Sequence, residues 1–300
     1  MAPQDPVRLA GVDAFTATPM AGNGAAVALL PAPAGERWMQ ALAAELQQSE
    51  TAFLWHDRTA DRWALRWFTP SCEVPLCGHA TLAATLALAH WGLLSPGVSL
   101  QLHSRSGPLA VGLDGAGGTA AWLELPTSDL LPRAPEPWMA ALPEGAPLQV
   151  WTSSLGYGVL LLSPESDLSR LDPRAEAWSA GPEQAWVVMR AGATAADPDA
   201  DYCLRFFAPG LGLVEDPVTG SAHALVAPWW CRQLGRSRVR GWQPSHRPGG
   251  VTLEPRPSGM IRLSGPGVLL WDGQMARPFE PSSAASWAGV VGWSATAGDA

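Results

Sequence analysis

The spacing of hydrophobic and polar positions predicts a chain built mainly of short strands with few helices. The segment Glu36–Gln47 has the spacing of an amphipathic helix, with Trp38, Met39, Leu42 and Leu46 on one side. Short apolar segments bounded by turn residues predict strands at Val7–Phe15, Ala25–Leu30, Thr51–His56, Arg62–Phe68, Ser99–His103, Leu109–Leu113, Ala120–Leu125, Gln149–Thr152, Gly158–Leu162, Ala185–Ala191, Tyr202–Phe207, Arg238–Trp242, Gly250–Glu254, Met260–Ser264 and Val268–Trp271.

The segment from Ala80 to Trp91 has no polar side, because it carries no charged residue when His90 is neutral. A helix that is apolar all round has no solvent face, so we expect protein on every side of it. Its start, at Gly78 and His79, offers backbone N–H groups that lack helical partners at the positive end of the helix dipole. The sequence therefore predicts a buried helix whose first turn is suited to an anion.

A second nearly uncharged helix is expected from about Ser221, and Pro228 should kink or end it. The two helices follow similar sequence in Trp67–Ala83 and Phe206–Val226. Each stretch has an aromatic strand ending, a proline, an acidic segment and then a glycine before small helical residues. This internal similarity suggests a duplication. The alternative is that two unrelated helices both happen to begin with glycine.

The chain is long enough for two domain-sized units, and a proline-rich connector is the best candidate boundary between them. We expect an N-terminal half over residues 1–130, the connector over 131–147, a C-terminal half over 148–282 and a tail over 283–300. The fold class expected is α+β. Each half would be a mixed β-sheet wrapped around one central buried helix, because an all-apolar helix needs cover that only the strands supply.

Composition excludes several classes of protein. Hydrophobic residues make up 47% and charged residues 15%, which disfavours disorder. The formal net charge is −8 and no run of Lys or Arg interrupts it, so we expect no nucleic-acid partner. The first residues do not have the pattern of a signal peptide, and no stretch reaches the ~18 uncharged apolar residues of a spanning helix. We therefore expect a cytoplasmic protein without a membrane partner.

Cysteine and histidine spacing gives no metal motif. The cysteines make neither a CxxC pair nor a zinc pattern, and HExxH is absent, so we expect reduced thiols and no metal. The stretch Ala21–Val27 has Gly22 and Gly24 of a dinucleotide loop but Val27 in place of the third glycine, so we expect no such cofactor. His223, inside the second helix, is interpreted as a hydrogen-bonded core residue. The cysteines are Cys72, Cys77, Cys203 and Cys231.

The two glycine-led helix starts are the first candidate site. If Gly78-His79 and Gly220-Ser221 face each other across a cleft between the halves, their amides would bind one substrate carboxylate. Glycine lets a ligand approach the backbone closely. The alternative is ordinary capping, by Thr219 or Ser221 for one helix and by His79 or water for the other.

Three side chains are candidates for the chemistry. If Glu50 faces the core, desolvation raises its pKa and makes it a usable proton shuttle near neutral pH; otherwise it faces solvent or pairs with Arg66. Asp216 would orient a substrate amine or hydroxyl, or it is only a turn residue before Pro217. His79 would donate to a carboxylate or move a proton.

Four blocks in this order resemble the PhzF-like family of phenazine-biosynthesis-type isomerases, which shares the diaminopimelate epimerase fold. They are VDAFTATPMAGNGAAVALL, SETAFLW, LRWFTPSCEVPLCGHATLAATLALAHWGLL and RFFAPGLGLVEDPVTGSAHALVAPWW, and the resemblance runs from about Val7 to Trp271. It implies two similar halves with the active site between them, a cofactor-independent acid/base enzyme and, commonly, a homodimer. The family's functional positions fall here on Glu50 (its catalytic Glu), Gly78-His79, Asp216 and Gly220-Ser221.

The wider fold includes epimerases that use two thiols, and Cys77 occupies one such place while Thr219 occupies the other. A hydroxyl accepts a proton far more weakly than a thiolate, so a two-thiol racemase is disfavoured. We expect an isomerase that moves a proton on a small carboxylate-bearing substrate. A hydro-lyase or epimerase acting on an amino or hydroxy acid, and a non-catalytic carboxylate-binding protein, stay as alternatives. Expected catalytic residues are Glu50, His79 and Asp216, and expected substrate-binding residues are Gly78, Gly220, Ser221, Thr219 and Cys77.

Overall fold

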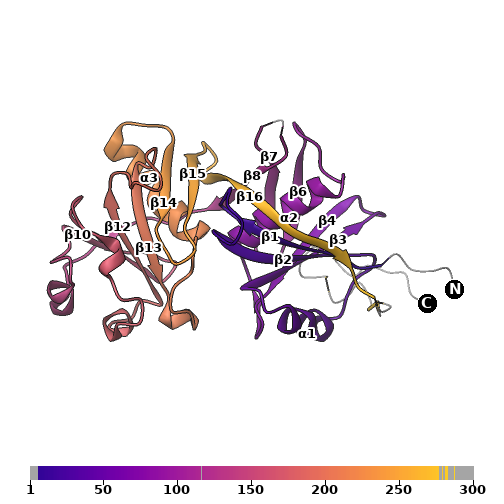
Figure 1. Cartoon of the computed structure of the whole chain (residues 1–300), viewed down its shortest axis with the longest axis horizontal. Helices are drawn as coiled ribbons and strands as arrows, with labels where there is room; N and C mark the ends of the chain where they lie inside the picture. Colours follow the sequence, from indigo (N-terminus) through magenta and orange to yellow (C-terminus); the bar gives the residue numbers. More distant parts are fainter. Residues whose placement is uncertain (1–5, 116, 277–278, 280, 283–286, 288–300) are drawn as a thin grey trace. The chain divides into compact units, whose positions relative to one another are not determined.

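The computed structural model describes residues 6–115, 117–276, 279, 281–282 and 287 (Figure 1). The chain forms two compact units. The first unit consists of Met1–Met20, Gly24–Glu124 and Gly265–Ala300, and the second consists of Ala21–Asn23 and Leu125–Ser264. Among the described residues, no helix is both long and apolar enough to cross a bilayer.

The first unit is a closed barrel of eight strands in the order β1-β2-β3-β4-β6-β7-β8-β16, with β16 pairing back to β1. The sheet is mixed: β2–β3 and β4–β6 are parallel, whereas β3–β4, β6–β7, β7–β8 and β1–β16 are antiparallel. The elements are β1 (Arg8–Ala14), β2 (Asn23–Leu30), α1 (Glu36–Leu46), β3 (Glu50–Asp57), β4 (Arg62–Phe68), β5 (Glu73–Val74), α2 (Gly78–His90), β6 (Ser99–Ser104), β7 (Gly107–Leu113), β8 (Ala120–Pro126) and β16 (Met260–Gln274).

Helix α2 lies within the first unit and packs against β1, β3 and β7 (Figure 1). Every residue from His79 to Leu88 is buried, as the all-apolar pattern predicted. The hydroxyls of Thr81 and Thr85 each donate to the carbonyl four residues earlier, at 2.6 and 2.8 Å, so neither is left unsatisfied. Strand β16 approaches the helix closely at Gly267, where a Cβ atom would lie 2.3 Å from Cδ1 of Leu86.

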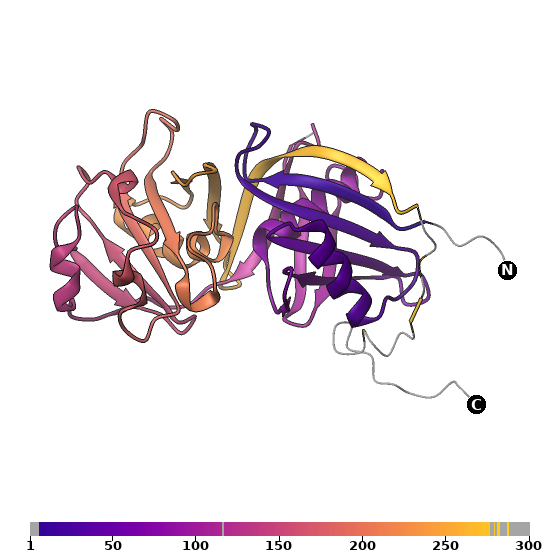
Figure 2. The same ribbon diagram turned by 60° about the horizontal axis from the view of Figure 1, so that its bottom comes forward.

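Helix α1 lies on the outside of the strands (Figure 2). Its buried residues Met39 and Ala43 belong to a core cluster that includes Phe53, Trp55 and Phe68 from the outer face of β3 and β4. The amphipathic helix predicted from the spacing over 36–47 is therefore confirmed. It positions the strand that begins at Glu50 from the side opposite α2.

The second unit places α3 against β14 and β15, and its sheet runs in the order β16-β15-β14-β13-β12-β11-β10-β9. Helix α3 connects the parallel pair β13–β14, just as α2 lies between the parallel strands β4 and β6. The inferred duplication itself stays a prediction. The elements are β9 (Leu131–Pro132), η1 (Pro137–Ala141), β10 (Gln149–Thr152), β11 (Tyr157–Leu161), η2 (Leu168–Arg170), η3 (Glu176–Ser179), β12 (Ala185–Ala191), β13 (Tyr202–Phe207), η4 (Pro209–Leu211), α3 (Gly220–Leu234), β14 (Val239–Gln243) and β15 (Gly249–Pro255).

Helix α3 continues past Pro228 to Leu234, so of the two effects expected of this proline, a kink or an end, the end does not occur. A proline in a helix removes the N–H that would bond the carbonyl four residues earlier, which here belongs to Ala224. The hydroxyl of Thr127 donates to that carbonyl at 3.0 Å. The orphaned acceptor is thus satisfied from outside the helix.

The compact units divide the chain differently from the predicted bounds. The longest segment of the first unit ends at Glu124 and not at residue 130. The segment predicted as a connector belongs to the second unit, where it contributes Met139 and Leu142 to the core. The two strands predicted at the C-terminal end are one long strand, β16, which returns the chain to the first unit at Gly265. Of the predicted tail over 283–300, only Trp287 lies within the described residues.

Candidate functional site

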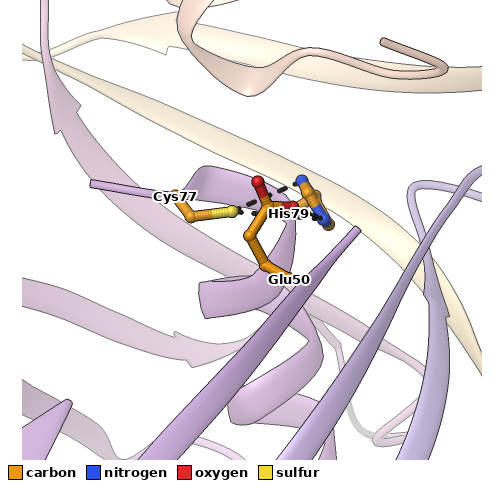
Figure 3. Close-up of side chains that lie close together, drawn as sticks. All are labelled: Glu50, Cys77 and His79. Atoms are coloured by element: carbon orange, nitrogen blue, oxygen red, sulfur yellow. Dashed lines mark hydrogen bonds and ion pairs between the residues drawn. The ribbon is translucent and has the colours of Figure 1, made fainter. Parts of the chain in front are cut away.

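Glu50, Cys77 and His79 come together where β3 meets the start of α2 (Figure 3). Glu50 is the first residue of β3, Cys77 is the residue before α2, and His79 is the second residue of the helix. The Oε2 atom of Glu50 lies 3.0 Å from Nε2 of His79. The Sγ atom of Cys77 lies 3.5 Å from Nδ1 and 4.0 Å from Nε2 of the same ring. The three side chains therefore form one contact group.

The group is largely withdrawn from solvent, and its charges are coupled. The side chain of Glu50 is 15% exposed and that of His79 is 6% exposed. Burial tends to raise the pKa of Glu50, but the charge of the neighbouring His79 and the other contacts of the carboxyl group together lower it more, so the net pKa is lowered. The expectation that desolvation would raise this pKa is therefore wrong. Glu50 rests as a carboxylate, the form that accepts a proton.

The pKa of His79 is shifted in the opposite direction. Burial alone lowers its pKa, but the contacts with Cys77 and the negative charge of Glu50 raise it well above the ordinary value. Burial, together with the Glu50 charge, raises the pKa of Cys77, which keeps this residue a neutral thiol. With the thiol neutral, the Glu50 carboxylate is the anion that holds His79 in its charged form.

Neighbouring contacts settle the alternatives for Glu50. The side chain of Glu50 does not face solvent, which was one alternative, and it does not pair with Arg66, which was the other: Arg66 pairs with Glu73 and Glu36, at 2.6 and 2.9 Å. The Oε2 atom of Glu50 is buried and has no partner that meets hydrogen-bond geometry, although His79 lies within ion-pair distance. Leaving a buried polar atom without a hydrogen bond costs free energy, and native proteins keep such atoms mainly where they serve a function.

The start of α2 supports the anion-binding interpretation. No side chain forms a capping hydrogen bond at its N-terminal residue Cys77, and the first turn contains no acidic residue. The same absence of a side-chain cap is found at Thr219 before α3. Capping by the Thr219 side chain, one form of the capping alternative, is therefore not observed. Gly78 is only half-buried, so its N–H group lies near the surface of the first unit.

In the second unit, Asp216 is fixed by a network of hydrogen bonds at the start of α3. Its Oδ1 accepts from Nδ2 of Asn23 at 2.7 Å, and its Oδ2 accepts from the hydroxyl of Thr219 at 2.6 Å. Gln243 donates to the Asp216 carbonyl at 2.6 Å and accepts from the Thr219 N–H at 3.0 Å. The network sets the direction of the carboxylate. It also engages the Thr219 hydroxyl, which agrees with the sequence argument against a two-thiol racemase.

Ser221 and His223 lie further along the same helix. The hydroxyl of Ser221 is 3.3 Å from that of Tyr157. His223 is fully buried, its Nδ1 lies 2.8 Å from the Tyr202 hydroxyl, and burial lowers its pKa to about 3. The interpretation of His223 as a neutral core residue is thus confirmed. The two sets of candidate residues belong to different compact units, so a single site made from both stays a prediction.

Sequence reasoning missed four residues that position these groups. Ser49 places its hydroxyl 3.1 Å from Nε2 of His79 while donating to the Gly24 carbonyl at 2.7 Å. It adjoins Glu50 in the sequence, which was the available signal. Asn23 stood in a stretch considered only for its glycines, and neither Tyr157 nor Gln243 had any local signal. Among the described residues, one group of side chains could hold a metal ion, namely Glu50, Cys77 and His79.

Known proteins match this chain over nearly its whole length. A family model described as phenazine biosynthesis-like protein (PhzC-PhzF) matches residues 12–273. An uncharacterized isomerase of Pseudomonas aeruginosa is 37% identical over 268 residues, which cover 88% of this chain and 96% of that protein. A crystal structure of a PhzF family protein from Enterococcus faecalis has a TM-score of 0.80 at 31% identity, covering 91% of this chain and all of that one.

A more distant structure shows the breadth of the fold. A hydroxyproline epimerase of Agrobacterium vitis covers 90% of each chain with a TM-score of 0.61 but only 13% identity, so it supports the fold alone. Family membership is shown by the matches in sequence. By its family model and its isomerase relatives, this chain belongs to the phenazine biosynthesis-like PhzC-PhzF family and is an enzyme of the isomerase type.

Proposed function

We propose that this chain is a cofactor-independent isomerase that moves a proton on a small carboxylate-bearing substrate, with Glu50 as the general acid and base. The observation that carries the proposal is the buried Glu50 carboxylate, whose Oε2 lies 3.0 Å from His79 but lacks a well-formed hydrogen bond. An anion held in this way is free to take a proton from carbon.

The chemistry balances without another reactant. Glu50 takes a proton from a substrate C–H bond, the electron pair moves into the substrate, and the new Glu50 O–H returns the proton at another carbon. The charge of His79 lowers the basicity of the carboxylate, and the same charge is placed to stabilise an anionic intermediate. A carboxylate of lowered basicity can remove a proton only from a weak C–H bond, so we expect a substrate whose C–H bond is already activated.

The substrate carboxylate is proposed to bind at the uncapped start of α2. The Gly78 and His79 N–H groups lie at the positive end of the helix, where anions are favoured. Ser221, Gly220 and Thr219 would contact the same substrate, and Asp216 would orient it. The fixed direction of the Asp216 carboxylate supports this positioning role.

Proton exchange tests the proposal. The purified protein is incubated in heavy water with a panel of cyclic and amino-acid carboxylates, and deuterium at carbon is measured by mass spectrometry. The proposal expects deuterium uptake into at least one carboxylate, and uptake that disappears in Glu50→Gln. Uptake that survives this substitution unchanged would show that another group moves the proton.

Epimerisation is the second candidate, because Cys77 adds a neutral thiol, which is a proton donor, to the group that holds the Glu50 carboxylate. The two groups lie within 4.8 Å of each other, so inversion would require the substrate carbon to turn between loss and return of its proton. The stereochemistry of the product separates the two reactions. Inversion at one carbon supports epimerisation, whereas a shifted double bond with retained configuration supports isomerisation.

A further inference from the structure

The contact group of Glu50, Cys77 and His79 has a composition that the proposed proton transfer does not need. A general base and its charged partner require only the carboxylate and the imidazole. The thiol adds a soft sulfur ligand, and the three ligand atoms all lie within 4.8 Å of one another. Carboxylate, imidazole and thiolate are the three ligand types that zinc accepts in proteins.

Two of the three separations in the group lie within about half an ångström of those around a tetrahedral ion. Zinc bonds of about 2.3 Å to sulfur and about 2.0 Å to nitrogen or oxygen hold the ligand atoms about 3.3–3.6 Å apart. Here Nε2 of His79 lies 3.0 Å from Oε2 of Glu50 and 4.0 Å from Sγ of Cys77. Changes of a few tenths of an ångström in side-chain position would make both separations fit.

The Oε2 atom of Glu50 is an independent indication of a ligand. It is buried and lies 3.0 Å from Nε2 of His79, but no contact of this atom meets hydrogen-bond geometry. A metal ion would satisfy this lone pair and the sulfur together. The positive end of α2 works against a cation here, and the two anionic ligands, carboxylate and thiolate, offset it.

We propose that Glu50, Cys77 and His79 bind one thiophilic divalent ion of the zinc class. The fourth coordination position of the ion would stay open, and the bound ion would inhibit the enzyme. Binding forms bonds from the metal to sulfur, nitrogen and oxygen, and the protons of the thiol and of the imidazolium pass to the buffer. No oxidation or reduction takes place. Metal binding and proton transfer exclude each other, since both use the same carboxylate oxygen; only this consequence rests on the proposed function.

Titration of the metal-free, untagged full-length protein with Zn²⁺ tests binding, with Cys77→Ala as the variant and Cys72→Ala as its matched control. Cys72 is exposed and lies outside the group. We expect one ion per wild-type chain and the same affinity in Cys72→Ala. The affinity should fall by at least about 100-fold in Cys77→Ala, because even an outer partner of a metal ligand is worth up to that factor. Equal affinity in Cys77→Ala would overturn the proposal.

Co²⁺ gives a spectroscopic readout that a merely structural role of Cys77 would not change. Wild type and Cys72→Ala should show a sulfur-to-cobalt charge-transfer band in the near ultraviolet, and Cys77→Ala should not. A band that is absent from wild type, or that persists in Cys77→Ala, contradicts the site.

In the exchange assay, activity should fall in proportion to zinc occupancy and return with chelator. Zinc bound at Cys77 in a protein without exchange activity would support the site and count against the proposed function.

Discussion

Replacing Glu50 by Gln tests the ionic coupling at the site. The substitution keeps the shape of the side chain and removes its charge, 3.0 Å from Nε2 of His79. At that separation and an effective dielectric constant of about 20, the attraction between the two charges is about 5 kcal/mol. Gln avoids the cost of burying a carboxylate, and His79 can release its proton. The net loss in free energy of unfolding should therefore be about 2 kcal/mol.

The loss should depend on pH in a way that the two pKa shifts determine. The folded pKa of Glu50 is lowered, so its stabilisation is present above the ordinary value of 4.5 and lost as pH falls through the folded value. The folded pKa of His79 is raised, so its stabilisation is present below the ordinary value of 6.5 and lost as pH rises through the folded value. The difference between wild type and variant should peak between these ordinary values.

Urea unfolding at a series of pH values measures this difference, and NMR titration of the His79 ring measures its pKa directly. We expect the pKa of His79 to fall in Glu50→Gln, because burial then acts with less opposition. Glu45→Gln, an exposed change on α1, is the matched control and should alter neither quantity. A His79 pKa that does not move, or a stability difference that is flat with pH, would refute the coupling.

Three further substitutions test the structure that holds the site. Arg66→Met should cost about 1–3 kcal/mol in urea unfolding, because Glu73 then keeps only Arg105, whose side chain is partly exposed, as its charged partner; no loss would contradict the importance of the Arg66–Glu73 pair. Thr127→Val should cost about 1–2 kcal/mol by leaving the Ala224 carbonyl without its donor, and no change would show that water replaces it. Gly267→Ala should cost about 1–3 kcal/mol in thermal unfolding through contact with Leu86, unless the helix shifts freely.

The parts of the fold that sequence predicted well are those with a long local pattern. The uncharged run after Gly78 predicted a buried helix, and α2 is buried throughout from His79 to Leu88. The spacing of α1 predicted its inward side correctly. Strand β16 was predicted as two strands, since its glycines at 265 and 267 interrupt the apolar pattern, and its pairing with β1 is a long-range contact without a local signal.

The sequence identified residues of the candidate site but did not predict the direction of the Glu50 pKa shift. The positions of Glu50 and His79 followed from the sequence, whereas the direction of the Glu50 pKa shift depends on a 3.0 Å contact between residues 29 positions apart. Asn23 and Gln243 escaped prediction for the same reason, because their partner Asp216 is distant in the chain. The continuation of α3 past Pro228 was not predicted, because Thr127, the donor that satisfies the Ala224 carbonyl, lies 97 positions away from it in the chain.

The most direct measurement is the rate of deuterium exchange into a responsive carboxylate, compared among wild type, Glu50→Gln and the control Glu45→Gln. If the residue at position 50 is the group that moves the proton, kcat/KM should fall about 100- to 10,000-fold in Glu50→Gln and stay unchanged in the control. A folded Glu50→Gln protein that exchanges at the wild-type rate would contradict the account.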